Sequence, residues 1–83
     1  MDGVTIYTAE PCRSCRNAKA LLDKREIPYV EVNLTKDPVG RAELSKQTGM
    51  LSFPQIVVGE RTVGGFEALV AADRDGTLRG LAA

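Results

Sequence analysis

The chain has 83 residues, and its 11 lysine and arginine residues balance its 11 aspartate and glutamate residues. This length allows one small domain, and we expect residues 1–83 to form it. The zero net charge argues against nucleic-acid binding and against a polybasic membrane-surface protein, and no apolar run approaches the ~18 residues of a membrane span.

The N-terminal half predicts a strand, a helix and a second strand. Residues 4–8 are β-branched or aromatic, which is typical of a short buried strand. From Cys12 onward apolar side chains recur at helical spacing. Pro28 should end this helix, because the residue before a proline avoids helical angles. Residues 29–33 then form the second strand, and such a unit gives a parallel pair with a right-handed crossover.

The C-terminal half predicts a helix, a hairpin and a further helix. Asp37 as N-cap and Pro38 at the first helical position predict a helix that runs to about Thr48, with Gly49 as its stop. The later elements are strands over residues 55–58 and 61–63 with a tight turn between them, a helix from about Gly65 to Gly76, and a short helical tail over residues 78–83.

The order of these elements indicates the fold class. A strand–helix–strand unit is followed by a helix, a hairpin and a last helix. We therefore expect an α/β fold in which helices cover both faces of a mixed four-stranded sheet. The N-terminus has an acid, Asp2, where a signal peptide has basic residues, so we expect a cytoplasmic protein without membrane attachment.

Cys12 and Cys15 are the chain's two cysteines, and it contains no histidine. They follow a predicted strand and open a helix, and a separation of three residues brings their sulfurs within disulfide range. Free N–H groups at the helix start favour the Cys12 thiolate. Arg13 and Arg16 would add to this effect if they point toward the sulfur. Cys15 lies on the apolar face, so Cys12 should attack and Cys15 should resolve the mixed disulfide.

Three other interpretations of the pair compete with a redox role. A structural zinc site needs four ligands, and the chain offers two cysteines and no histidine. A purely stabilising disulfide would close a short loop worth about 2 kcal/mol, and a reducing cytoplasm would oppose it. Chance spacing is the third. A redox pair accounts best for two cysteines at a strand–helix junction.

The whole chain resembles the bacterial dithiol glutaredoxins, which have the thioredoxin fold. The matching segments are residues 6–8, the Cys-Arg-Ser-Cys sequence of residues 12–15, and residues 18–22, 48–49, 52–59 and 63–69. The resemblance implies a thioredoxin-like fold and a glutathione-dependent thiol–disulfide oxidoreductase. It implies a monomer that reduces disulfide-bonded or glutathionylated proteins and needs no metal for the redox cycle.

The resemblance also implies where glutathione binds. It implies a cis bond before Pro54 and pairing of the Phe53 backbone with the cysteine moiety of glutathione. The N–H groups of Gly65, Phe66 and Glu67 would receive the γ-glutamyl carboxylate at a helix N-terminus. Residue types alone are equally consistent with a proline that starts a strand and with a glycine turn that leads into a helix.

Three positions depart from the family pattern. Ala9 stands where glutaredoxins commonly have a lysine that meets the glycyl carboxylate, Arg13-Ser14 replaces Pro-Tyr, and Leu51 replaces a basic residue. These departures remove three usual glutathione contacts. Lys46 is a candidate substitute cation, although a solvated helix charge is the simpler interpretation.

Two alternative functions follow from these departures. The first is a redoxin that thioredoxin reductase reduces and that donates electrons to ribonucleotide reductase. Ala9 favours it, and the ordinary glutaredoxin sequence of residues 64–67 argues against it. The second is a carrier that holds a [2Fe–2S] cluster between two subunits with one cysteine each and two glutathiones. The absence of a proline after Cys12 favours this alternative.

Overall fold

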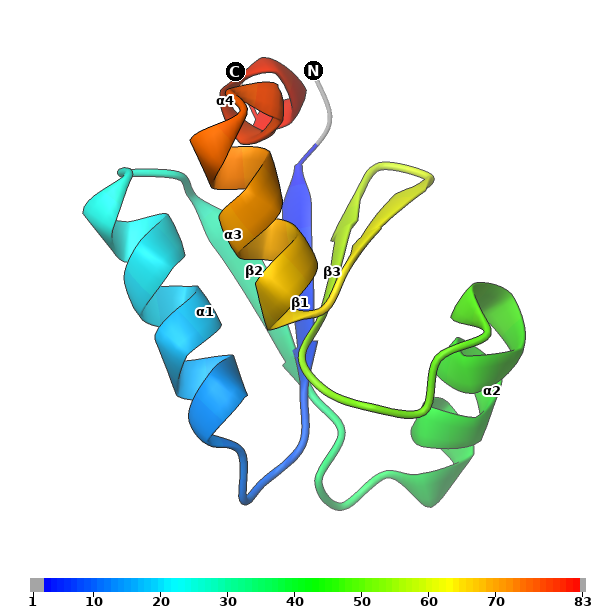
Figure 1. Ribbon diagram of the computed structural model, residues 1–83. Helices are drawn as coiled ribbons and strands as arrows, with labels where there is room; N and C mark the ends of the chain where they lie inside the picture. Colours follow the sequence, from blue (N-terminus) through cyan, green and yellow to red (C-terminus); the bar gives the residue numbers. More distant parts are fainter. Residues whose placement is uncertain (1–2, 83) are drawn as a thin grey trace.

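A computed structural model describes residues 3–82 of the chain as a four-stranded sheet with helices packed against it (Figure 1). Residues 1, 2 and 83 of the domain expected over residues 1–83 lie outside this description. The elements are β1 (Val4–Thr8), α1 (Arg13–Lys24), β2 (Tyr29–Asn33), α2 (Pro38–Thr48), β3 (Gln55–Val58), β4 (Arg61–Gly64), α3 (Phe66–Arg74) and α4 (Thr77–Ala82). None of the helices within this range is both long and apolar enough to cross a bilayer.

The sheet has the strand order β2-β1-β3-β4, with β1 parallel to β2 and antiparallel to β3. β3 and β4 form the antiparallel hairpin that the sequence predicts. The mixed four-stranded sheet is therefore confirmed. β1 lies in its centre, and the end of β1 leads directly to Cys12.

The two faces of the sheet carry different helices. α1 and α3 cover one face and α2 lies on the other (Figure 1). Along β1, Val4, Ile6 and Thr8 are buried and alternate with partly exposed residues, as a strand with two unlike faces requires. The main core lies under α1 and α3 and consists of Val4, Ile6, Ala18, Leu22, Ile27, Ile56, Val58, Leu69, Ala72 and Leu78.

The end of α1 differs from the prediction. The helix ends at Lys24, well before Pro28, and Glu26 takes a left-handed conformation with φ 57°. The Glu26 N–H donates to the Asp23 carbonyl at 3.0 Å, and the Ile27 N–H donates to the Leu22 carbonyl at 2.9 Å. These bonds form a Schellman motif. It turns the chain so that Ile27 joins the core beside Leu22.

The C-terminal helix boundaries also differ slightly from the prediction. α3 ends at Arg74, before the expected Gly76, and α4 begins at Thr77. Gly76 lies between the two helices with φ 83°, a conformation that favours glycine. The last residue of the expected tail, Ala83, lies outside the described residues.

Candidate redox site

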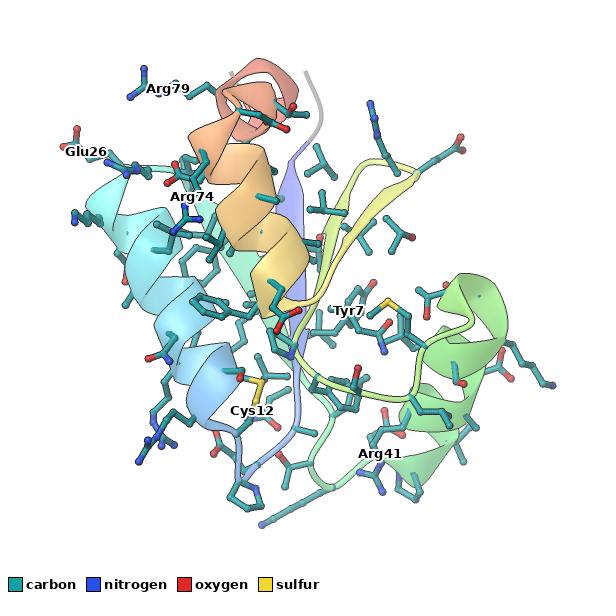
Figure 2. All side chains as sticks on the ribbon, in the orientation of Figure 1. Tyr7, Cys12, Glu26, Arg41, Arg74 and Arg79 are labelled. Atoms are coloured by element: carbon teal, nitrogen blue, oxygen red, sulfur yellow. A yellow bond between two sulfur atoms is a disulfide. The ribbon has the colours of Figure 1, made fainter. Side chains whose placement is uncertain are left out.

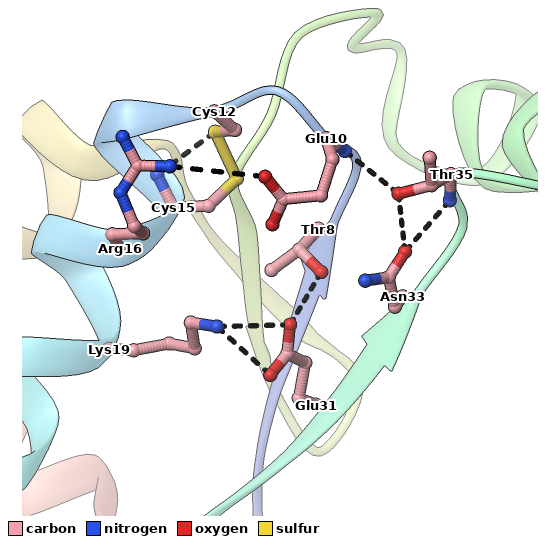
Figure 3. Close-up of polar contacts among 9 residues, drawn as sticks. All are labelled: Thr8, Glu10, Cys12, Cys15, Arg16, Lys19, Glu31, Asn33 and Thr35. Carbon is pink, nitrogen blue, oxygen red and sulfur yellow. Dashed lines mark hydrogen bonds and ion pairs between the residues drawn. A yellow bond between two sulfur atoms is a disulfide. The ribbon is translucent and has the colours of Figure 1, made fainter.

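A disulfide joins Cys12 and Cys15 at the start of α1 (Figures 2 and 3). Cys12 is the N-cap of the helix, and the two Cα atoms are 5.2 Å apart, an ordinary separation for a disulfide. Cys15 is fully buried, whereas Cys12 is partly exposed. A partner from solvent therefore reaches the Cys12 sulfur first.

The start of α1 directs a hydrogen-bond donor at the outer sulfur. The Cys15 N–H donates to Cys12 Sγ at 2.9 Å. A thiolate accepts such a bond more strongly than a neutral sulfur does, so this contact favours the ionised form of reduced Cys12. Arg16 pairs with Glu10 across 3.9 Å and is largely exposed. The expectation that Arg16 adds positive charge at the sulfur is thus weakened, because Glu10 offsets that charge.

The segment that leads into Cys12 is tied to the loop after β2. The Glu10 N–H donates to Thr35 Oγ1 at 2.8 Å, and Thr35 in turn donates to Asn33 (Figure 3). The bond between Glu10 and Pro11 is cis. These contacts fix the chain on one side of the disulfide.

A buried hydroxyl and an ion pair lie near the disulfide (Figure 3). Thr8, which is fully buried at the end of β1, donates to Glu31 Oε2 at 2.8 Å. Lys19 Nζ lies 3.1 Å from Glu31 Oε1. The Thr8 hydrogen bond, and after it Lys19, holds the pKa of Glu31 below its usual range. This group joins α1 to the parallel pair of β1 and the edge strand β2.

The opposite wall of the site is the loop that enters β3. The bond between Phe53 and Pro54 is cis, as the resemblance implies. The amide of Gln55, a side chain that is only 1% exposed, donates to the Ser52 carbonyl at 3.0 Å and to the Met50 carbonyl at 3.3 Å. The buried Gln55 side chain therefore fixes the backbone of this loop by hydrogen bonds.

A pocket of about 510 Å³ lies between this loop and the start of α3. All five expected glutathione-binding residues line it: Phe53, Pro54, Gly65, Phe66 and Glu67. Ser14 also lines it, so the pocket extends to the segment between the two cysteines. Ser14 is not among the glutathione-binding residues expected from the sequence, although its position between the two cysteines indicates that it lies near the reacting sulfurs.

Two glycines lie where β4 leads into α3, at one wall of the pocket. A Cβ atom at Gly64, where φ is 128°, would lie 2.8 Å from the Cβ of Ala68. A Cβ at Gly65 would lie 3.5 Å from the Pro54 carbonyl oxygen, an ordinary van der Waals distance, so the start of α3 lies beside the cis-proline. Gly65 is the N-cap of α3 and has no capping side chain, which leaves the first N–H groups of the helix available to an anion.

A second pocket of about 370 Å³ adjoins the first and shares Met50 and Phe53 with it. Arg41 and Leu51 line this second pocket. Arg41 lies at the same end of the molecule as Cys12 (Figure 2), and its Nη1 donates to the carbonyls of two residues in the loop after β2. Lys46, the substitute cation considered from the sequence, lines neither pocket.

The zinc interpretation finds no ligand set here. Within residues 3–82, no three histidine, cysteine, aspartate or glutamate residues lie close enough together to hold a metal ion. The two cysteines are bonded to each other. The geometry fits two sulfurs that exchange between a dithiol and a disulfide, with a pocket beside the segment that joins them.

Comparisons with known proteins agree with this geometry. The family model described as Glutaredoxin matches residues 4–63. A glutaredoxin of Pseudomonas aeruginosa is 40% identical over 98% of this chain and 96% of its own length. The solution structure of glutaredoxin from Brucella melitensis has a TM-score of 0.86 and 38% identity, covering 99% of this chain and 89% of its own.

A more distant structure shares the fold. The crystal structure of a buckwheat glutaredoxin–glutathione complex has a TM-score of 0.88 at 24% identity, and the match covers 98% of this chain and 76% of that one. Together with the Brucella structure it confirms the thioredoxin-like fold that the sequence predicts.

Proposed function

The chain belongs to the glutaredoxin family of thiol–disulfide oxidoreductases, and from that premise we propose that glutathione reduces its Cys12–Cys15 disulfide. One observation carries the proposal. The five residues that the resemblance assigns to glutathione line a single pocket, and that pocket reaches the segment between the two cysteines.

The proposed cycle begins when the Cys12 thiolate attacks a substrate disulfide. One substrate thiol leaves, and a mixed disulfide forms at Cys12. Cys15 then attacks Cys12 Sγ, which releases the second substrate thiol and leaves the Cys12–Cys15 disulfide. One glutathione opens that disulfide at Cys12, and a second glutathione takes the first away as glutathione disulfide. For a glutathionylated protein, Cys12 removes the glutathione directly and Cys15 is not needed.

Glutathione is placed by the two walls of the pocket. We assign the Phe53 backbone, which lines the pocket beside Pro54, to the cysteine moiety of glutathione. The N–H groups of Gly65, Phe66 and Glu67 receive the γ-glutamyl carboxylate, because a helix N-terminus without a capping side chain attracts an anion. The buckwheat glutaredoxin, whose structure is a glutathione complex, supports this class of ligand.

Arg41 is our candidate for the glycyl carboxylate. The family lysine is replaced by Ala9, and Lys46 lines neither pocket. Arg41 lines the adjoining pocket, and only its Nη1 is used by the two loop carbonyls. A guanidinium has five N–H donors, so the others remain for a carboxylate.

We place this activity in the cytoplasm, where thiols are kept reduced. Its partners there are disulfide-bonded or glutathionylated proteins, and the chain acts as a monomer because one chain holds both cysteines and the whole pocket.

The test is an NADPH-linked assay on the mixed disulfide of cysteine and glutathione. One arm contains glutathione and glutathione reductase, and a parallel arm contains thioredoxin reductase alone. Turnover in the glutathione arm is the expected result. Turnover only with thioredoxin reductase would assign the chain to the alternative redoxin class. An absence of turnover in both arms would overturn the proposal. The alternative would then be a [2Fe–2S] carrier, which visible absorbance after anaerobic purification would identify.

A further inference from the structure

An apolar surface lies beside the redox pocket. Met50, Leu51 and Phe53, which we call the apolar rim, all line the second pocket. Leu51 is 86% exposed, and among the residues whose burial the structure describes the other exposed large hydrophobic side chains are Val39 at 72% and Val30 at 63%. Single exposed apolar residues are common on protein surfaces. The apolar rim, in contrast, is continuous with the redox pocket, because Met50 and Phe53 line both cavities.

Glutathione does not account for the apolar rim. It consists of glutamate, cysteine and glycine, so its apolar parts are isolated methylene groups. In the proposed binding mode those of the γ-glutamyl chain lie at the start of α3, and that of the cysteine lies at the reacting sulfur. Burial of a leucine side chain against an apolar group is favourable, and glutathione has no such group to offer Leu51. The rim therefore indicates the other reactant of the cycle, which is the disulfide-bearing protein.

We propose that the apolar rim docks a protein substrate segment that carries an apolar side chain next to its reacting cysteine. This inference rests on the proposed function, because protein and glutathione would occupy the same pocket in alternate half-reactions. The bound segment places its disulfide against Cys12 and its apolar neighbour against Leu51 and Met50. Two electrons pass from the Cys12 and Cys15 thiols to the substrate disulfide, and the two substrate thiols leave with the protons.

The position of Leu51 makes it a determinant of specificity. It lies between Met50 and Ser52, whose carbonyls both accept from the Gln55 amide, so its backbone has a fixed place at the second pocket. A basic residue at this position would favour an acidic neighbour of the substrate cysteine. Leucine selects an apolar neighbour instead.

The test uses protein reduced with dithiothreitol and then desalted, in single turnover without glutathione. Two synthetic peptides each contain one intramolecular disulfide and differ in having leucine or serine beside each cysteine. Each rate is divided by the rate of the same peptide with dithiothreitol, which removes intrinsic reactivity. We expect the wild-type protein to prefer the leucine peptide about tenfold, as burial of part of a leucine side chain predicts.

Leu51→Ser should lower this preference to about twofold or less, while Val30→Ser, the matched control, should keep it. Val30 is also exposed, and it pairs with Thr5 toward the other end of β1. A wild-type protein without preference, or a Leu51→Ser protein that keeps it, would overturn the inference. Failure of the proposed function would look different, because the peptide preference would persist while glutathione failed to support turnover.

Discussion

On one face of the sheet, α1 and α3 pack on a continuous apolar core, whereas α2 on the other face buries Leu44 and is tied to neighbouring segments by side-chain hydrogen bonds of Arg41 and Thr48. The redox disulfide belongs to the first face, since Cys15 is fully buried at the start of α1. The loop that faces the disulfide belongs to the second, and the amide of Gln55 holds it. Hydrophobic packing thus fixes the buried sulfur of the disulfide, and a few hydrogen bonds fix the loop to which we assign substrate binding.

Loss of the outer sulfur should have the largest effect. Cys12→Ser should lower turnover of a glutathione mixed disulfide by ~1000-fold or more, because serine is a far weaker nucleophile than a thiolate. Cys15→Ser should retain this activity and lose reduction of protein disulfides. Steady-state assays of the two variants check this, and an active Cys12→Ser protein would contradict the assignment of the nucleophile.

The difference in packing can be measured as stability. Leu22→Ala removes a fully buried side chain under α1 and should lower the free energy of unfolding by about 2 to 5 kcal/mol. Val39→Ala on α2, at a side chain that is 72% exposed, should change it by about 0.5 kcal/mol or less. Urea unfolding of both variants in the reduced state measures the contrast. Equal losses would contradict the burial of Leu22 in the core under α1.

Gln55→Leu tests the polar wall directly. It leaves the carbonyls of Met50 and Ser52 without this donor and should cost about 1 to 3 kcal/mol in stability. Because the loop then loses its fixed place, KM for glutathione should rise more than kcat falls. Gln47→Leu, at an exposed glutamine of α2, is the control. Unchanged kinetics in the Gln55→Leu variant would remove the loop from the substrate site.

The smallest effect concerns pH. The Thr8 hydrogen bond lowers the pKa of Glu31 below its ordinary value of 4.5, so this carboxylate contributes stability above that pH. The contribution is lost as pH falls through the lower pKa of the folded state. Glu31 is partly exposed, so we expect less than about 1 kcal/mol. Thr8→Val should flatten the decline in stability between about pH 6 and pH 3 that urea unfolding records; an identical decline would contradict it.

Local signals predict most of the fold. β-Branched runs mark the strands, and Asp37 and Gly49 bound α2 as the sequence indicates, with the Asp37 side chain accepting from the Gly40 N–H at 2.8 Å. The end of α1 escapes such reasoning, because Glu26 takes the left-handed position that glycine usually fills. Nothing in a single glutamate marks that conformation. It is imposed by burial of Ile27 in the core.

The residues of the candidate site likewise fall into those that the sequence identifies and those that only the fold identifies. Cys12 and Cys15 are visible from spacing and position, since one helix turn contains them both. Arg41 and Gln55 are not, because they reach the site only through the tertiary arrangement of α2 and β3. The sequence offers Lys46 as the alternative cation, one helical turn or more from Arg41. Only the fold distinguishes which of the two lines a pocket.

The sulfur of Cys12 has two duties, because it caps α1 and also carries the redox chemistry. The same atom therefore couples the folding equilibrium to the electron-transfer equilibrium through one thermodynamic cycle. Any strengthening of the cap by the thiolate stabilises the folded dithiol relative to the folded disulfide. The reduction potential of the protein must then differ from that of its unfolded chain by the difference in unfolding free energy between the two forms. A substitution in the first turn of α1 that alters the strength of this cap therefore also alters the reduction potential of the protein.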